Sequence, residues 1–203
     1  SLGTVNLQGL SPISRSINHL GILAGSLADC WITTRHISVT TGGEPGQLPL
    51  EGPVEMPEAK KPATLIKLET PGWQKTPENA RQQLDDYLET LRQSGIVIKD
   101  RNNDKDVAAY ENAISDIVYI SDTLRSYENR YPNYWYLENH GDQLRPETRD
   151  TLENTEPVSL EAFTKAHHQA NELRNLHAAL ISNADGFITL NSVGVAPECM
   201  STG

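Results

Sequence analysis

The stretch ATLIKLETPGWQKTPENARQQLDDYLETLRQSGIVIKD, residues 63–100, decides the fold. Its first six residues are mostly apolar and predict a short strand that ends before a Pro-Gly pair. A helix should follow, because Thr76 suits the N-cap and Pro77 the first helical position. Gly95 suits a left-handed helix end, and the β-branched run 96–98 predicts a second strand. Strand, helix and strand with tight connections predict a βαβ unit with parallel strands.

Further elements are predicted on both sides of this unit. Apolar residues recur at helical spacing over 15–36 and from 106 to about 127, so both stretches are predicted as helices. Pro132 is expected to end the second of them. A short helix is predicted near Pro146, within the segment that precedes the last long helix.

The last part of the chain predicts one more helix and one more strand. Ser159 is placed as the N-cap of a long helix, and His177 falls on its apolar face, which favours a hydrogen-bonded core histidine. A turn at Asp185-Gly186 then leads into a third strand at 187–190.

The predicted fold class is α/β, with a small, mostly parallel sheet of three or more short strands, a βαβ unit and a large helical cover. We expect a helical arm at 1–40, a loop at 41–62, and an α/β unit at 63–203 with a helical insert at about 104–183. Three short strands after a long loop make a thin sheet for an independent domain, so the chain is expected to belong to a larger one.

Composition excludes several partners. The net charge is −10 with no clustered Lys and Arg, which argues against nucleic acid. No apolar run approaches the roughly 18 residues of a membrane span, so no membrane partner is expected. Cys30 and Cys199 lie far apart without a CxxC companion, and no signal peptide is visible at 1–7. A cytoplasmic location is therefore expected.

No cofactor or metal is predicted. His167, His168 and His177 share one helix, but their spacings of one, nine and ten residues do not converge as metal ligands at i and i+4 would. The acidic pair Asp85-Asp86 is interpreted as a solvated helix face, with polar pairs four residues apart such as Glu89 and Gln93.

Several motifs in the expected order resemble the amidase-signature family. The segment Gly9 to Ala24, followed by Ser26-Leu27-Ala28-Asp29, resembles the region after the family's signature, and Ser1-Leu2-Gly3 is similar to the residues after its Gly-x-Lys-Pro motif. Near the end, residues 184–190 with Val195-Ala196-Pro197 and Thr202-Gly203 resemble "Asp-x-hydrophobic-hydrophobic-Thr-Pro… Ala-Pro… Thr-Gly". The stretch Leu144 to Arg149 fits "Leu-x-Pro-x-Thr-Arg". The resemblance spans essentially the whole chain and implies a partial amidase-signature fold.

The chain also departs from the family's pattern. Asn18 stands where the family usually has Asp, Asn191 stands where Pro is common, and Thr41-Gly42-Gly43-Glu44 replaces an acidic Asp-x-x-Asp. These departures indicate a divergent branch and leave the substrate open.

The resemblance implies that catalytic residues lie outside this stretch. Family members use a Ser nucleophile, a second Ser in a cis peptide within a Gly/Ser-rich stretch, and a Lys, all of which precede the Lys-Pro motif. The chain contains no Gly-Gly-Ser-Ser-Gly-Gly-Ser-type stretch, and Ser14 and Ser16 are interpreted as residues that cap or precede the first helix. No catalytic residue is therefore predicted here, because an activated hydroxyl needs a base and an oxyanion hole.

One segment is a candidate substrate pocket. Aromatic residues gather at Tyr131, Tyr134, Trp135 and Tyr136, and a run of aromatics in a helical cover can wall a pocket or pack beneath a loop. The family's helical insert lies near the pocket mouth, which implies a role in substrate selection.

The leading hypothesis is an internal segment of an amide hydrolase, inactive alone, whose partners are the rest of the amidase domain and a small-molecule amide. A non-catalytic interaction domain and a family scaffold without catalysis are the alternatives. Uncovered sheet edges also predict self-association.

Overall fold

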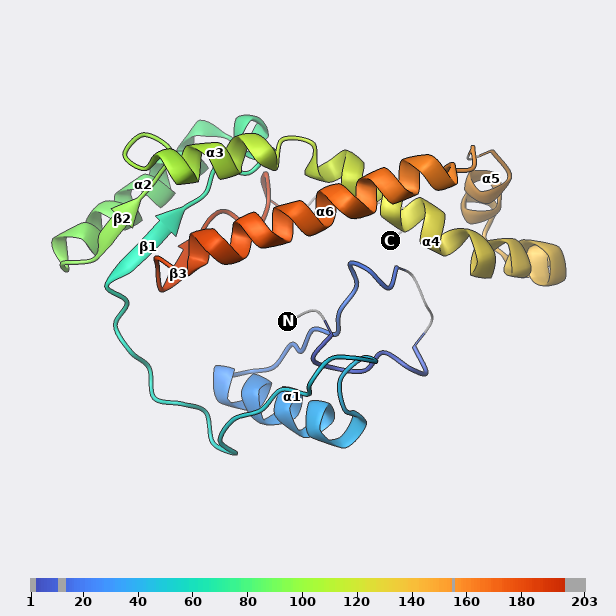
Figure 1. Cartoon of the computed structure of the whole chain (residues 1–203), viewed down its shortest axis with the longest axis horizontal. Coiled ribbons are helices and arrows are strands. Elements are labelled where there is room, and N and C mark those ends of the chain that lie inside the picture. The colour runs from blue at the N-terminus through green and yellow to red at the C-terminus, as the bar shows by residue number, and fades with distance from the viewer. Residues whose placement is uncertain (1–2, 11–13, 155, 196–203) are drawn as a thin grey trace. The chain divides into compact units, whose positions relative to one another are not determined.

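The structure is a computed structural model that describes residues 3–10, 14–154 and 156–195. The chain divides into two compact units, one formed by 1–59 and 121–167 and the other by 60–120 and 168–203. Figure 1 shows the elements of both.

The second unit contains a parallel sheet in the order β2-β1-β3. Strand β1 spans Thr64–Lys67, β2 spans Val97–Lys99 and β3 spans Gly186–Ile188. Leu65 pairs with Ile98 on one side and with Gly186 on the other. The predicted α/β class and the parallel βαβ unit are therefore confirmed.

Helix α2 (Glu78–Gln93) connects β1 to β2 and covers one face of the sheet (Figure 1). Leu84 and Leu88 are buried against Ile98 and Trp73, while Leu65 packs against the same cluster. The N-cap is Pro77, one residue later than predicted, and Gly95 has a φ of +89° as its left-handed role requires.

The other face of the sheet is covered by α3 (Lys105–Ala113) and by the second part of α6 (Leu160–Ile181). Ile66 of β1 and Leu68, the residue after that strand, pack with Val107 of α3 and Leu180 of α6. Successive side chains of a strand point to opposite faces, so β1 contributes to both clusters and its backbone lies between two helical layers.

The first helix was predicted wrongly at its beginning. Helix α1 spans Leu27–Thr41, whereas residues 15–26 form turns and irregular structure. Ser26 caps α1: its Oγ accepts the backbone N–H of Asp29 at 3.1 Å and donates to that residue's carboxylate at 2.8 Å. The apolar spacing before Ser26 was helix-like, but the cap decides where the helix starts.

The helix predicted from 106 to about 127 is two helices. Helix α3 ends at Ala113 and α4 spans Ile117–His140, with a turn between them that contains Ser115 and Asp116. Such short polar residues offer the backbone alternative hydrogen bonds and favour helix ends. Pro132 lies inside α4 and does not end it. Proline lacks a backbone N–H and so removes one hydrogen bond of the helix. The turns on either side keep their hydrogen bonds, so the helix continues through Pro132.

The helices that follow α4 agree with the sequence, whereas β3 spans Gly186–Ile188 instead of the predicted 187–190 and His177 differs in burial. A short 3-10 turn at Gly141–Gln143 comes first, α5 spans Pro146–Asn154 as predicted, and Ser159 Oγ accepts the N–H of Ala162 as the cap of α6. His177 is exposed, so its predicted core position is wrong. Its ring contacts partly buried residues at the edge of the cluster around Ile66. Its Nδ1 lies 3.0 Å from Tyr110 Oη, and its ring centroid lies 4.6 Å from that of Phe187.

Candidate functional site

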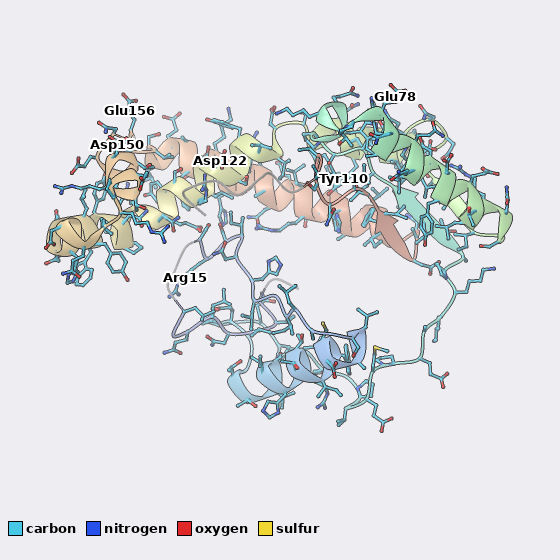
Figure 2. The ribbon with its side chains drawn as sticks, turned by 180° about the vertical axis from the view of Figure 1, so that it is seen from behind. Arg15, Glu78, Tyr110, Asp122, Asp150 and Glu156 are labelled. Carbon is cyan, nitrogen blue, oxygen red and sulfur yellow. The ribbon has the colours of Figure 1, made fainter. Side chains whose placement is uncertain are left out.

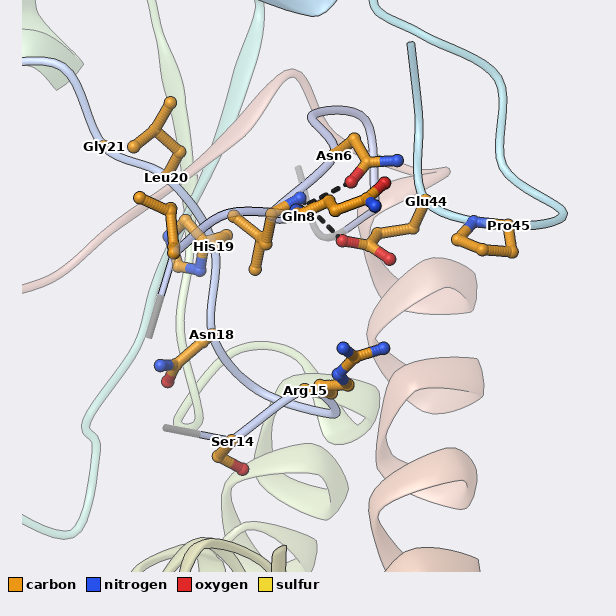
Figure 3. Close-up of a pocket in the computed structure, with 12 residues that line it drawn as sticks. Asn6, Gln8, Ser14, Arg15, Asn18, His19, Leu20, Gly21, Glu44 and Pro45 are labelled. Atoms are coloured by element: carbon orange, nitrogen blue, oxygen red, sulfur yellow. Dashed lines mark hydrogen bonds between the residues drawn. The ribbon is translucent and has the colours of Figure 1, made fainter. Parts of the chain in front are cut away.

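A pocket of about 500 Å³ lies in the first unit, where the segment before α1 meets the turn after it (Figure 3). Its wall combines apolar side chains with groups that can donate or accept hydrogen bonds. The lining residues are Asn6, Leu7, Gln8, Leu10, Ser14, Arg15, Asn18, His19, Leu20, Gly21, Glu44 and Pro45.

Glu44 holds two distant segments together on one side of this pocket. Its Oε1 accepts the backbone N–H of Leu7 at 2.7 Å, and its own N–H donates to the carbonyl of Gly3 at 2.8 Å. Asn6 adds a backbone bond to the carbonyl of Gly42 at 3.0 Å, and its Oδ1 accepts the N–H of Gln8 at 2.8 Å (Figure 3). These hydrogen bonds hold the segment before α1 against the turn after it, although the bonded residues lie in no helix or strand.

Ser14 is the buried serine of the pocket, with 2% of its surface exposed. Its hydroxyl donates to Glu128 Oε2 on α4 at 2.5 Å, and the backbone N–H of Ser16 donates to the same oxygen at 3.1 Å. Neither serine caps a helix, since α1 begins at Leu27. The carboxylate instead ties the loop to α4, and the Ser14 hydroxyl is directed at a carboxylate rather than at a lysine.

The four predicted aromatic residues all lie on the second half of α4 and are exposed; Tyr131 is 73% and Trp135 is 54% exposed. Trp135 contacts Tyr136 edge-on, with ring centroids 5.3 Å apart, and the Arg130 guanidinium lies 5.0 Å from the Tyr131 ring. These contacts are between neighbours on one helix.

Tyr134 lines a second pocket, of about 300 Å³, between α4, α5 and the segment that leads to α6. Its wall is polar on the α4 side, where Arg125, Asn129 and Arg130 contribute, and apolar at Leu152. Figure 2 labels Asp122, whose carboxylate pairs with Arg125 at 3.0 Å. Tyr134, one of the predicted residues, thus lies in a cavity wall.

Similarity to known proteins is found in the fold and not in the sequence. No protein-family model matches the chain, and no curated protein matches its sequence. A crystal structure of an amidase is similar in fold, with a TM-score of 0.65 and 20% sequence identity. The chain folds like part of an amidase. The match covers 92% of this chain and 38% of the amidase chain, so the chain spans less than half of that protein's length.

This similarity bears on the fold alone, because 20% identity transfers no residue roles. It agrees with the amidase-like architecture that the sequence motifs imply, while membership of the signature family stays a prediction. In the described part of the chain, no helix combines the length and apolar character needed to cross a membrane. Cys199 and the Ala-Pro and Thr-Gly motifs beyond Val195 lie outside the described residues.

The N-terminal pocket was missed by the sequence analysis, which assigned five of its twelve lining residues to a helix. The missed residues include Arg15, Asn18 and His19. The signal was available: Ser26 with Asp29 three residues later forms a capping box, and Gly21 and Gly25 precede it. That pattern predicts irregular structure before Ser26 and a helix after it.

Proposed function

We propose that this chain is an internal segment of an amidase-like amide hydrolase, in which it supplies strands of the sheet and a helical cover. The observation that supports this most directly is the fold similarity to an amidase over 92% of the chain. The order of sequence motifs from Gly9 to Leu190 is independent support. The reaction of the whole hydrolase would be acyl transfer from an amide to water through a serine acyl-enzyme.

We further propose that the chain alone does not hydrolyse amides. An acyl-transfer serine needs a base that removes its proton and donors that hold the oxyanion. The Ser14 hydroxyl donates a hydrogen bond to Glu128 that anchors the loop, and the burial of Ser14 restricts access by a substrate. The catalytic serines and lysine are expected in the part of the hydrolase that this sequence does not include.

Incubation of the purified chain with small amides and esters, and with a fluorophosphonate serine reagent, tests this proposal. We expect neither turnover nor labelling. Turnover together with labelling at Ser14, both lost in Ser14→Ala, would overturn it. Reading the coding sequence upstream of Ser1 is the second test: a Gly/Ser-rich stretch with a preceding lysine is expected, and a start codon directly before Ser1 would contradict it.

The aromatic residues of α4 are proposed to line the substrate pocket of the assembled hydrolase. Tyr134 is the best supported, since it already borders a cavity. In the assembled enzyme, Tyr134→Ala should raise KM for a bulky amide more than for acetamide, because a lost wall affects large substrates most. Equal effects on both substrates would argue against a pocket role.

A non-catalytic interaction domain is the second candidate function. The exposure of Tyr131 and Trp135 favours it, because aromatic residues are enriched at protein interfaces. A cytoplasmic location, the absence of nucleic-acid and membrane partners, and an amide as the small-molecule ligand stay predictions of the sequence.

A further inference from the structure

A third pocket, of about 450 Å³, lies in the second unit where β1 and β2 end. Lining residues between 69 and 74 follow β1, and Arg101 follows β2. Helix α3 contributes Glu111 and Asn112, and Ser115 lies in the turn after it. Ligands of open parallel sheets bind outside the carboxyl ends of the strands, so the position is one where binding is common. Its polar lining residues are Glu69, Thr70, Gln74, Arg101, Glu111, Asn112 and Ser115.

Glu111 is one of the lining residues, and only 2% of its side chain is exposed. Its Oε1 accepts the backbone N–H of Glu69 at 2.7 Å, at a point where β2 has ended and offers no ladder partner. Its Oε2 accepts no hydrogen bond from any residue in 3–10, 14–154 or 156–195. A buried carboxylate oxygen that accepts no aligned hydrogen bond keeps a lone pair for a ligand that can donate one.

Arg101 is the nearest cation to that open oxygen. Its Nη1 lies 3.3 Å from Glu111 Oε2 and 4.0 Å from Glu69 Oε2, which makes ion pairs without an aligned hydrogen bond. The Arg101 side chain is partly exposed, and it lies beside the open acceptor. The pocket therefore presents a donor and an acceptor next to one another.

The charges around this pair select a neutral ligand. A second cation at Glu111 Oε2 would be repelled by the Arg101 guanidinium, and an anion at Arg101 would be repelled by Glu69 and Glu111. Lys67 already forms ion pairs, since its Nζ lies 2.9 Å from Asp85 and 3.4 Å from Glu69. A single water occupies roughly 30 Å³, far less than this pocket offers.

We propose that this pocket binds a small neutral polyol, through a hydroxyl that donates to Glu111 Oε2 and accepts from Arg101. A hydroxyl oxygen can do both with one atom, which suits two partners separated by 3.3 Å. The amides of Gln74 and Asn112 and the hydroxyl of Ser115 can both donate and accept, so they fit further hydroxyls of the same molecule. The proposal does not depend on the amide-hydrolase function.

The test is a titration of the purified full chain with xylitol, followed by NMR at the backbone amide of Glu69 and the indole N–H of Trp73. Thermal shift is unsuitable, because polyols stabilise most proteins by exclusion from the surface. We expect both signals to shift in a saturable way with one Kd. Shifts that grow linearly without saturation would overturn the proposal.

Glu111→Gln is the discriminating variant. Its amide oxygen can still accept from Glu69 N–H, while its Nε2 replaces the open acceptor with a donor. Kd for xylitol should rise by about tenfold or more, as expected for a lost hydrogen bond to a charged group. Glu78→Gln, at an exposed residue in the first turn of α2, is the matched control and should leave Kd unchanged.

If Glu111→Gln does not fold, Arg101→Gln provides the second variant and should weaken xylitol binding as well. Acetamide carries the same neighbouring donor and acceptor, and methylammonium carries donors alone. Saturable binding of either with none of xylitol would overturn the polyol assignment, as would a Kd for xylitol that neither variant changes.

Discussion

Asp185 and Thr64 are joined by two hydrogen bonds that run in opposite directions, although the residues lie 121 positions apart. The backbone N–H of Thr64 donates to Asp185 Oδ2 at 2.9 Å, and the backbone N–H of Asp185 donates to the Thr64 carbonyl at 2.9 Å. Ala63 N–H donates to the same carboxylate oxygen at 2.7 Å. Asp185 thus provides hydrogen-bond partners for the backbone at the start of the central strand β1, and the next residue, Gly186, begins β3.

Asp185→Asn should weaken the sheet most at neutral pH. The hydrogen bonds from Thr64 and Ala63 hold the pKa of the Asp185 carboxyl below its ordinary value of 3.8. The carboxylate therefore contributes stability that is present above pH 3.8 and is lost as pH falls through the lowered pKa. Urea unfolding from about pH 6 to about pH 3 should show wild type and variant converging towards the acid end. A constant difference would contradict this account.

Glu111→Gln should show the opposite trend with pH. Burial is the main cause that raises the pKa of Glu111 above its ordinary value of 4.5, and the nearby Glu69 charge raises it further. The hydrogen bond from Glu69 N–H, Arg101 and Lys67 oppose this shift.

A carboxyl with a raised folded pKa contributes stability below pH 4.5 that is lost as pH rises through the raised value. Relative to wild type, the free energy of unfolding of the variant should therefore increase as pH rises from about 4 to about 7. Equilibrium urea unfolding at a series of pH values measures this, with Glu78→Gln as the control that should show no such trend. A relative loss on raising the pH would contradict the assignment.

Ser26→Ala should destabilise the beginning of α1 by about 1 kcal/mol, because the variant cannot accept the N–H of Asp29. Native-state hydrogen exchange of the Asp29 amide reports this locally and does not require the whole chain to unfold as one unit. Ser26→Thr keeps the accepting hydroxyl and should restore most of the protection. Equal exchange in all three proteins would show that the cap is dispensable.

Val97→Lys should reduce self-association of the chain. Val97 lies on β2, which pairs with β1 in the described sheet, and its side chain is 57% exposed. A charge on an edge strand discourages pairing with another chain. Sedimentation velocity over a range of concentrations measures the effect.

Val39→Lys is the matched control for this experiment, since Val39 is 56% exposed but lies on helix α1. It should associate like wild type. If both variants reduce association equally, added charge alone is responsible. If the wild-type chain is monomeric at high concentration, the edge prediction is wrong.

The sequence determined the βαβ unit because its signals are local. Apolar runs, a Pro at the helix start and Gly95 at its end fix strand, helix and strand within 63–100, and parallel pairing follows from the short connections. The caps at Ser26 and Ser159 are equally local, and the first could have corrected the predicted start of α1.

Only the tertiary structure decided how charged residues are used. Glu111 lies four residues after Val107 on the apolar face of α3, which indicates burial, but its partner Glu69 N–H belongs to the segment after β1. Glu128 likewise accepts hydrogen bonds from the Ser14 hydroxyl, 114 positions away, and from the backbone N–H of Ser16. Such pairs depend on which distant donors the fold brings to each carboxylate, and periodicity along one segment carries no information about that.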